Sequence, residues 1–285
     1  MTRQERAERT RHKLIHSAAV VFDRHGFTRT TLNDISRLAG MSTGALHFHF
    51  ANKEAVADAV ECSASGALHH AALLVRQGGE GPREALQALA DVSHTLAQLL
   101  HWDVVVRAGF RLNHDRLNDD RAGRPGATPD LRQEWKTCVR RLLDDAAAEK
   151  TLTPGIDICA MTATITAATT GLAVLGRGDA EWLSRESLTD LWQVLLPRLT
   201  APEILAQLEP AGADSVIAAS VAGAWDTASA GASEADRRRQ PSFDGCDRNE
   251  SWTKDGCMHE RVPLDNSTEL ADRVQHSGQT HLHSQ

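Results

Sequence analysis

The sequence contains no tyrosine and no long apolar run. No stretch approaches the roughly 20 consecutive apolar residues that a membrane-spanning helix needs. The N-terminus runs directly into Arg3, Glu5 and Arg6, without the apolar core of a signal peptide. We therefore expect a soluble, cytoplasmic protein that has no membrane partner.

Cysteine is scarce as well, and nothing in its spacing indicates a disulfide framework or a metal site. The five cysteines are odd in number and widely separated, as expected for free thiols in a reducing compartment: Cys62, Cys138, Cys159, Cys246 and Cys257. Neither Cys246 nor Cys257 has a CxxC or HxxxH partner nearby, so we expect no metal. The motifs GxSxG and HExxH and the Gly-rich phosphate loop are also missing, so we expect neither an enzyme nor a cofactor.

Charge is distributed unevenly along the chain. The formal net charge is -7, which at first opposes binding to nucleic acid. However, residues 1–53 hold nine Lys/Arg against four Asp/Glu, whereas residues 203–285 hold seven against fourteen. A basic N-terminal region is therefore masked by an acidic C-terminal one.

Apolar residues recur at three- and four-residue spacing and no segment alternates long enough for a strand, so the pattern predicts an all-α protein. Glycine, proline and capping residues then place the expected helices. These helices cover about residues 4–25, 31–39, 42–49, 52–75, 83–100, 101–114, 130–150, 156–176 and 181–197. We expect a DNA-binding domain over residues 1–54, a helical domain over 55–210 and a polar, largely disordered tail over 211–285.

The second and third expected helices have the dimensions of a helix-turn-helix, with Gly40 permitting the sharp turn between them. In this geometry the start of the third helix meets base edges, and the starts of the second and fourth helices meet phosphates. We accordingly predict that Ser42, Thr43 and Gly44 enter the major groove. The predicted backbone contacts come from Arg3, Thr31, His47, His49 and Lys53. Leu46, Phe48 and Phe50 are expected in the core of this domain.

Residues 31–55, TLNDISRLAGMSTGALHFHFANKEA, resemble the tetracycline-repressor (TetR) family. The opening RQERAERTRHKLIHSAAVVF and the Phe-His-Phe segment at 48–50 are most similar to the γ-butyrolactone autoregulator receptors of antibiotic-producing filamentous bacteria. The resemblance implies a dimeric repressor that binds a palindromic operator and is released by a small apolar effector. Two positions depart from the pattern: His47 replaces the usual tyrosine, and Thr43 stands where close relatives often carry lysine.

The resemblance also implies an effector pocket in the second domain. Trp135 is the leading candidate, because the butyrolactone receptors place a tryptophan near the start of the corresponding helix. Weaker candidates are Trp102, Phe110, Thr166 and Thr170. A purely structural core role is the alternative for both tryptophans.

The last two long helices have the pattern of a dimer interface, with small residues on one and bulky residues on the other. The small positions are Ala160, Thr164, Ala167, Ala168, Gly171 and Leu172. The bulky positions are Leu188, Leu191, Trp192, Leu195 and Leu196, and burial in the chain's own core is the alternative for each. For function, an efflux or catabolic regulator, a pseudo-receptor that answers antibiotics, and an enzyme or scaffold with an incidental helix-turn-helix remain alternatives.

Overall fold

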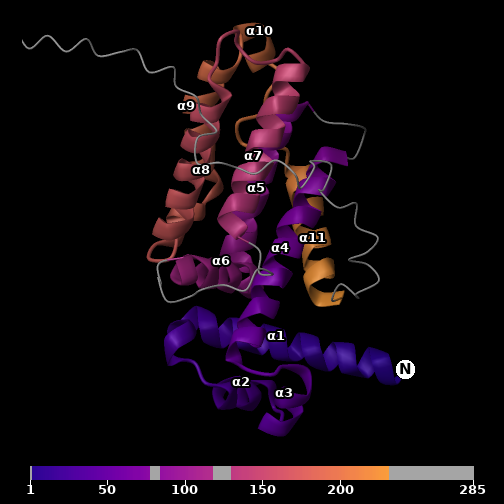
Figure 1. The fold of residues 1–285 in the computed structure, drawn as a ribbon. Helices are drawn as coiled ribbons and strands as arrows, with labels where there is room; N and C mark the ends of the chain where they lie inside the picture. Colours follow the sequence, from indigo (N-terminus) through magenta and orange to yellow (C-terminus); the bar gives the residue numbers. More distant parts are fainter. Residues whose placement is uncertain (1, 78–83, 118–129, 231–285) are drawn as a thin grey trace, which may run out of the picture. The chain divides into compact units, whose positions relative to one another are not determined.

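The computed structural model describes residues 2–77, 84–117 and 130–230, and within these ranges every regular element is helical (Figure 1). The prediction of an all-α protein is confirmed. Residues 78–82 and 119–126, which the sequence predicts as a linker and a polar loop from their glycine, proline and charged residues, lie outside the described residues. The long helices are α1 (Arg3–Arg29), α4 (Lys53–Gln77), α5 (Ala85–Trp102), α6 (Val104–Leu117), α7 (Leu131–Ala148), α8 (Ile158–Leu175), α9 (Arg185–Leu199) and α11 (Asp214–Ala230). The short ones are α2 (Leu32–Ala39), α3 (Thr43–His49), η1 (Ala180–Leu183) and α10 (Pro202–Leu205).

Helices α1 to α3 form a small unit at one end of the molecule, which we call the head (Figure 1). Gly26 has a φ of +74°, so α1 bends there and only its last few residues continue to Arg29. The expected helix end at Gly26 is therefore a kink in the structure. Leu14, Phe22 and Ile35 are almost fully buried in the head core, which also receives side chains from the start of α4 and from α6.

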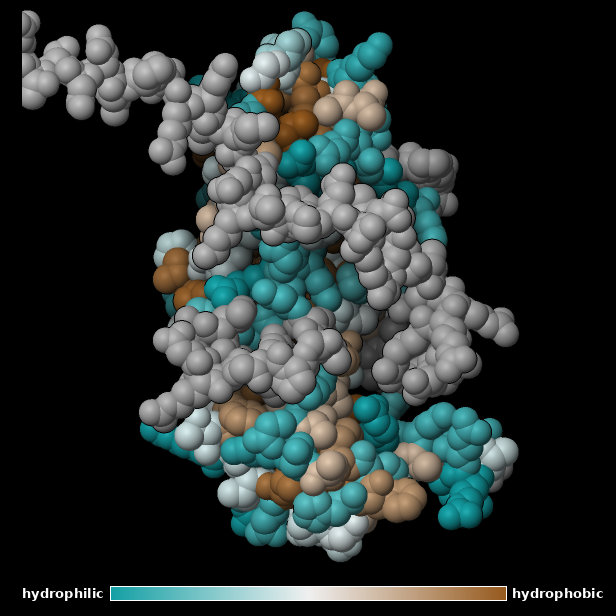
Figure 2. Space-filling model, viewed as in Figure 1, coloured by the Kyte–Doolittle hydropathy of each residue, from teal (hydrophilic) through white to brown (hydrophobic). Residues whose placement is uncertain are grey.

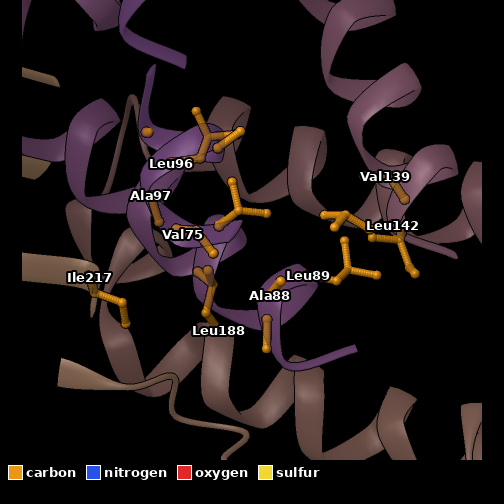
Figure 3. Close-up of a cluster of buried hydrophobic side chains, with 14 of the residues drawn as sticks. Val75, Ala88, Leu89, Leu96, Ala97, Val139, Leu142, Leu188 and Ile217 are labelled. Carbon is orange, nitrogen blue, oxygen red and sulfur yellow. The ribbon is translucent and has the colours of Figure 1, made fainter. Parts of the chain in front are cut away.

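The remaining helices form the body, and α4 runs without interruption from the head into it (Figure 1). A second core lies between helices α4, α5, α7, α9 and α11, and Figure 3 shows side chains from all five meeting there. Residues of α4 contribute to both cores. The expected domain boundary at residue 54 lies in the first turn of this helix, so it does not separate the two cores. A displacement of α4 in the body therefore acts on the head directly.

Helix α11 corrects the expectation that the chain is disordered from residue 211. Val216, Ile217, Val221 and Ala224 are buried against α4 and α5, at a spacing of one to four residues that small neighbouring residues had obscured in the sequence. Gly223 permits the close approach, because a Cβ there would lie 2.4 Å from Leu74 Cδ1. The rest of the predicted disordered tail, residues 231–285, lies outside the described residues.

Buried polar side chains of α5 fasten the segment that leads into α11. Asp91 is fully buried and accepts hydrogen bonds from Gln87 Nε2 at 2.8 Å and from the Ala213 backbone N–H at 2.9 Å. His94 Nε2 lies 2.9 Å from the Pro210 carbonyl, which requires this nitrogen to carry the proton. Burial is the largest influence on His94 and lowers the pKa of its imidazole. Together these contacts fix α11 on the body.

Helix α8 is apolar, but only Thr162 and Ile165 of it are buried, and most of its residues are half-buried; Figure 2 shows hydrophobic residues at the surface along the α8 and α9 edge. Its 18 residues have a mean hydropathy of 1.7, and 11% of them are buried. By length and composition this helix could cross a membrane, so the sequence-based exclusion of any such stretch was wrong. A single helix of this kind is weak support for a membrane protein, and threonines break its apolar surface.

Helix α9 corrects part of the expected dimer interface. Leu188, Trp192, Leu195 and Leu196 are buried in the body core, because this face of α9 turns toward α5 and η1. Among the exposed residues of α9, Val194 is the large hydrophobic one and is 71% exposed. On α8, three of the expected interface residues are exposed, namely Ala160, Thr164 and Ala167, and three are half-buried, namely Ala168, Gly171 and Leu172. On α9, Leu191 is half-buried.

Candidate nucleic-acid interface and effector site

Helix α2 begins at a reciprocal cap formed by Thr31 and Asp34. The Asp34 backbone N–H donates to Thr31 Oγ1 at 3.2 Å, and Thr31 donates its own N–H and hydroxyl to the Asp34 carboxylate. These hydrogen bonds hold the pKa of Asp34 below its ordinary value. Thr31 is exposed, as the predicted phosphate contact requires, but its hydroxyl is already engaged in the cap. Any effect of Thr31 on a phosphate contact is therefore indirect: the cap fixes the orientation of the first turn of α2.

The turn between α2 and α3 has the geometry that the sequence predicts. Gly40 is left-handed, with a φ of +65°, and the Met41 N–H donates to the Ser36 carbonyl at 2.9 Å. Ser42 then caps α3, since its hydroxyl accepts a hydrogen bond from the Ala45 N–H at 3.1 Å. Ser42 is therefore the N-cap of α3, and Thr43 is its first residue.

The start of α3 is open to solvent at the positions expected to read bases. Ser42 and Gly44 are exposed, and Thr43 is half-buried with its hydroxyl 3.4 Å from that of Ser36. Leu46, one turn later, is fully buried and anchors the helix to the head core. The arrangement presents one small hydroxyl side chain and a glycine backbone at the tip of a rigid helix.

Further along α3, the structure corrects the placement of Phe48. Leu46 and Phe50 are buried, as predicted, but Phe48 is 79% exposed, because positions four apart share one face of a helical turn and the position between them faces the other way. Its ring packs edge-on against His49 at 5.2 Å. Phe48 is therefore a surface residue beside the reading face that the sequence interpretation missed, and the 46/50 spacing of the buried residues is the signal that separates it from them.

The two predicted histidine contacts differ in their surroundings. His47 is exposed, whereas His49 is half-buried, and its burial, with Arg11 as a smaller influence, lowers the pKa of its imidazole. Arg11 itself lies over the Phe50 ring, 5.2 Å from the centroid. The lowered pKa favours the neutral imidazole of His49, which retains one hydrogen-bond donor; its predicted phosphate contact stays a prediction.

Arg3 and Lys53 are the first and the last residues in the sequence that are predicted to contact the DNA backbone. Lys53 Nζ donates to the carbonyls of Phe27 and Thr30 at 3.0 and 3.1 Å and lies 4.3 Å from the Phe27 ring centroid. Two of its three donors therefore tie α4 to the end of α1, which leaves one for a phosphate. Arg3 is exposed in the first turn of α1.

In the body, Trp135 is 2% exposed and donates its indole N–H to Thr169 Oγ1 at 2.8 Å. Thr169 was not among the predicted effector residues. Thr166, one turn earlier on α8, has a buried Oγ1 without a hydrogen-bond partner.

Three other predicted effector residues fall at two separate places. Phe110 and Thr170 line a cavity between α6, α8 and η1 that also exposes several arginines. Trp102 is 68% exposed and lines a different groove, together with Arg9, His12 and Lys13 of α1. Trp102 therefore does not share a pocket with Phe110, because the α5–α6 corner turns its ring outward.

No cluster of three or more His, Cys, Asp or Glu side chains suited to a metal occurs in the ranges that the structure describes. Cys246 and Cys257 lie outside these ranges. Cys138 is half-buried, and its burial raises the pKa of the thiol to about 12, so it is a protonated side chain at physiological pH.

Comparison with known proteins places these features in a family. The profile described as bacterial regulatory proteins of the tetR family matches residues 14–60, which span the head and the first turns of α4. The structure of TylP, a TetR regulator from Streptomyces fradiae, is 31% identical and superposes with a TM-score of 0.55, over 79% of this chain and 93% of TylP. The chain belongs to the TetR family of transcriptional regulators.

Two further TetR-family relatives concern signalling. The A-factor receptor protein of Streptomyces griseus is 29% identical over 213 residues, which are 74% of this chain and 71% of that protein. A γ-butyrolactone receptor described as ArpA-like is 26% identical with a TM-score of 0.57, over 78% of this chain and 98% of that structure. The predicted resemblance is confirmed, and membership of a family of regulators bears out the expectation that the protein is not an enzyme.

Proposed function

We propose that this TetR-family regulator is a homodimeric repressor that binds a palindromic operator in the cytoplasm and is released by a γ-butyrolactone-type effector. The observation that carries the proposal is the continuity of α4. The Asn52 side chain caps the start of this helix in the head, and the helix ends in the body beside α5 and α11. A change in the body is thereby transmitted to the reading helix α3 without an intervening flexible segment.

The DNA contacts follow from the exposed edge of the head. Thr43 and Gly44 approach base edges, and Phe48 offers an apolar surface that suits a thymine methyl group. His47, His49, Arg3 and the remaining donor of Lys53 face phosphates. Because Thr43 replaces a charged residue of close relatives, we expect less electrostatic and more shape-dependent recognition at this position.

The dimer forms through α8 and the outer face of α9. Exposed small residues on α8 permit close helix approach, and Leu175 and Val194 are 48% and 71% exposed, which leaves apolar surface for a second copy. The buried residues of α9 support this surface from beneath. The dimer must hold its two α3 helices roughly 34 Å apart to fit successive major grooves.

The effector occupies the body beside Trp135. Thr166 and Thr169 supply hydroxyls on the same side of α8, and the indole provides a flat apolar face. Its single N–H, which donates to Thr169, would exchange this partner for a lactone carbonyl. Since Trp135 is closed in by the core, an effector has to part α7 from α8, and the resulting displacement of α4 would change the spacing of the heads.

The test is a mobility-shift titration on the gene's own upstream DNA at fixed salt, with and without a γ-butyrolactone panel. We expect specific binding that a butyrolactone abolishes in the wild type and in Trp102→Phe, and that it no longer abolishes in Trp135→Ala. Trp102→Phe is the matched control because its ring is exposed and outside this site.

Two results would contradict the proposal in different ways. Specific operator binding that no butyrolactone of the panel abolishes would exclude a butyrolactone effector and favour a pseudo-receptor or efflux regulator with another ligand. Equal binding to operator and scrambled DNA would remove the repressor itself.

A further inference from the structure

A bowl of about 700 Å³ opens between the end of α1, helix α6 and the α8–η1 turn. A narrow apolar cleft of about 50 Å³ continues from it toward Phe110 and Thr170. Six residues line both parts: Leu100, Arg107, Arg111, Gly176, Arg177 and Leu183. Gly176 shapes the wall, because a Cβ there would lie 2.5 Å from Leu183 Cγ. The site therefore joins a wide polar mouth to a short apolar slot.

The charge of this site is positive. Four arginines line its two parts, namely 107, 111, 132 and 177, against the two aspartates Asp23 and Asp115. In the described ranges, Arg132 and Arg177 form no side-chain ion pair. Asp115 and Asp23 attract the Arg177 guanidinium from a distance while Arg111 repels it, and its partial burial lowers its pKa. Two guanidiniums thus face the site without a close counter-charge.

The other two arginines connect the body to the head. Arg107 Nε lies 3.0 Å from Asp23 Oδ2, and Arg111 donates to the Asp23 backbone carbonyl. Arg107 also donates to the His101 carbonyl at 2.9 Å, which fixes its position at the α5–α6 corner. Asp23 lies in α1, so these contacts link α6 to the head at the rim of the bowl.

We infer that this arginine-lined bowl binds a small amphipathic carboxylate, whose head group competes with Asp23 for Arg107 and Arg111. Part of its chain enters the apolar slot, and the rest lies in the bowl along Leu100 and Leu183. A carboxylate fits because guanidinium groups bind it through paired, charge-assisted hydrogen bonds. Arg132 and Arg177 supply affinity, and the loss of the Asp23 contacts loosens the head. The effect on DNA rests on the proposed repressor function, whereas the binding itself does not.

The probe is octanoate, with methyl octanoate as a neutral ligand of the same shape. Binding is measured by isothermal titration calorimetry on the full chain without DNA. The key variant is Arg132→Gln/Arg177→Gln, which removes two charges and keeps the Asp23 contacts. The matched control is Arg140→Gln, since Arg140 is exposed on α7 and paired with Asp144 at 2.9 Å outside the bowl.

We expect octanoate to bind the wild type and Arg140→Gln equally, and to bind the double variant about tenfold or more weakly, because two charge-assisted contacts are lost. Methyl octanoate is expected not to bind. Equal affinity of the double variant, or equal binding of the ester, would overturn the site. Thermal unfolding without ligand verifies that the double variant is folded.

The link to the head is tested separately by operator binding. Octanoate should weaken the wild-type operator complex, and Asp23→Asn should weaken it without octanoate. Octanoate that binds the bowl but leaves a specific operator complex unchanged would overturn the link. Failure of the unliganded wild type to bind operator would instead contradict the repressor function, with the calorimetric result unaffected.

Discussion

The head and the body differ in where their shaping contacts come from. In the head, Thr31 pairs with Asp34 and Ser42 with Ala45, so both caps join residues three positions apart. In the body, Gln87 and Asp91 hold backbone groups 122 residues away in the segment before α11. A local sequence pattern therefore shapes the head, which we propose reads DNA. Long-range burial shapes the body, where we propose that the effector binds.

The largest expected effect tests the body core. Trp192→Ala should lower the free energy of unfolding by about 3–5 kcal/mol, because a fully buried indole leaves a cavity. Val194→Ala, two residues away and exposed, should change it by less than about 0.5 kcal/mol in the monomer. Urea unfolding at low protein concentration measures both. A larger loss in Val194→Ala would place this face of α9 in the core instead.

The joint between the two regions comes next. A Cβ at Gly109 of α6 would lie 2.4 Å from Ala64 Cβ of α4, so Gly109→Ala should destabilise the protein by about 1–3 kcal/mol and disturb operator binding. Gly66→Ala is the control on α4, since nothing lies within 4 Å of its Cβ position. This control should be neutral or stabilising by up to about 1 kcal/mol. Equal thermal stability of the two variants would show that α4 and α6 are not closely packed.

In the head, Thr31→Ala removes the α2 cap and should cost about 0.5–2 kcal/mol. Thr31→Ser keeps the hydroxyl and should retain most of the stability. Chemical denaturation measures the loss, and hydrogen exchange should place it in α2. Uniformly faster exchange throughout the body would contradict a local role.

A pH effect tests the buried histidine of the body. Burial lowers the pKa of His94, so the unfolded state binds more protons as pH falls below about 6.5, and stability is lost on acidification. His94→Gln keeps a donor for the Pro210 carbonyl but does not titrate, so its stability should depend less on pH between 7 and 5, a range of about two units. Identical pH profiles for the variant and the wild type would show that His94 does not cause the dependence.

The smallest stability effect is expected at Phe48. Because its ring is 79% exposed, Phe48→Ala should alter unfolding by less than about 0.5 kcal/mol. We expect Phe48→Ala to lower the affinity for operator DNA instead, which fluorescence anisotropy measures on the same samples. A large stability loss with unchanged affinity would return Phe48 to the core and remove it from the DNA surface.

The head could be predicted closely because its determinants are local. Gly40 at a positive φ, Ser42 at the α3 cap and Asn52 before α4 are visible as residue types at fixed offsets. Phe48 was misplaced because its aromatic character was weighed above its position, although the spacing of Leu46 and Phe50 places it on the opposite face.

In the body the sequence predicted helices but not their partners. Helix α11 was missed because its buried positions, such as Val216 and Val221, stand among alanines and serines that also characterise disordered segments. The inward orientation of Trp192 depends on η1 and α5, which no local pattern connects to α9. The arginine-lined bowl likewise brings together Asp23, Arg107 and Arg177 from three distant segments.

The central claim, a sequence-reading head on a responsive body, is tested most directly by fluorescence anisotropy with operator and scrambled DNA at one salt concentration. The account predicts tight, saturable binding to operator by the wild type and by Trp102→Phe. For the double variant Thr43→Ala/Phe48→Ala it predicts affinity close to that for scrambled DNA, with unchanged thermal stability. Equal operator affinity of this variant and the wild type would contradict the claim that α3 reads the operator.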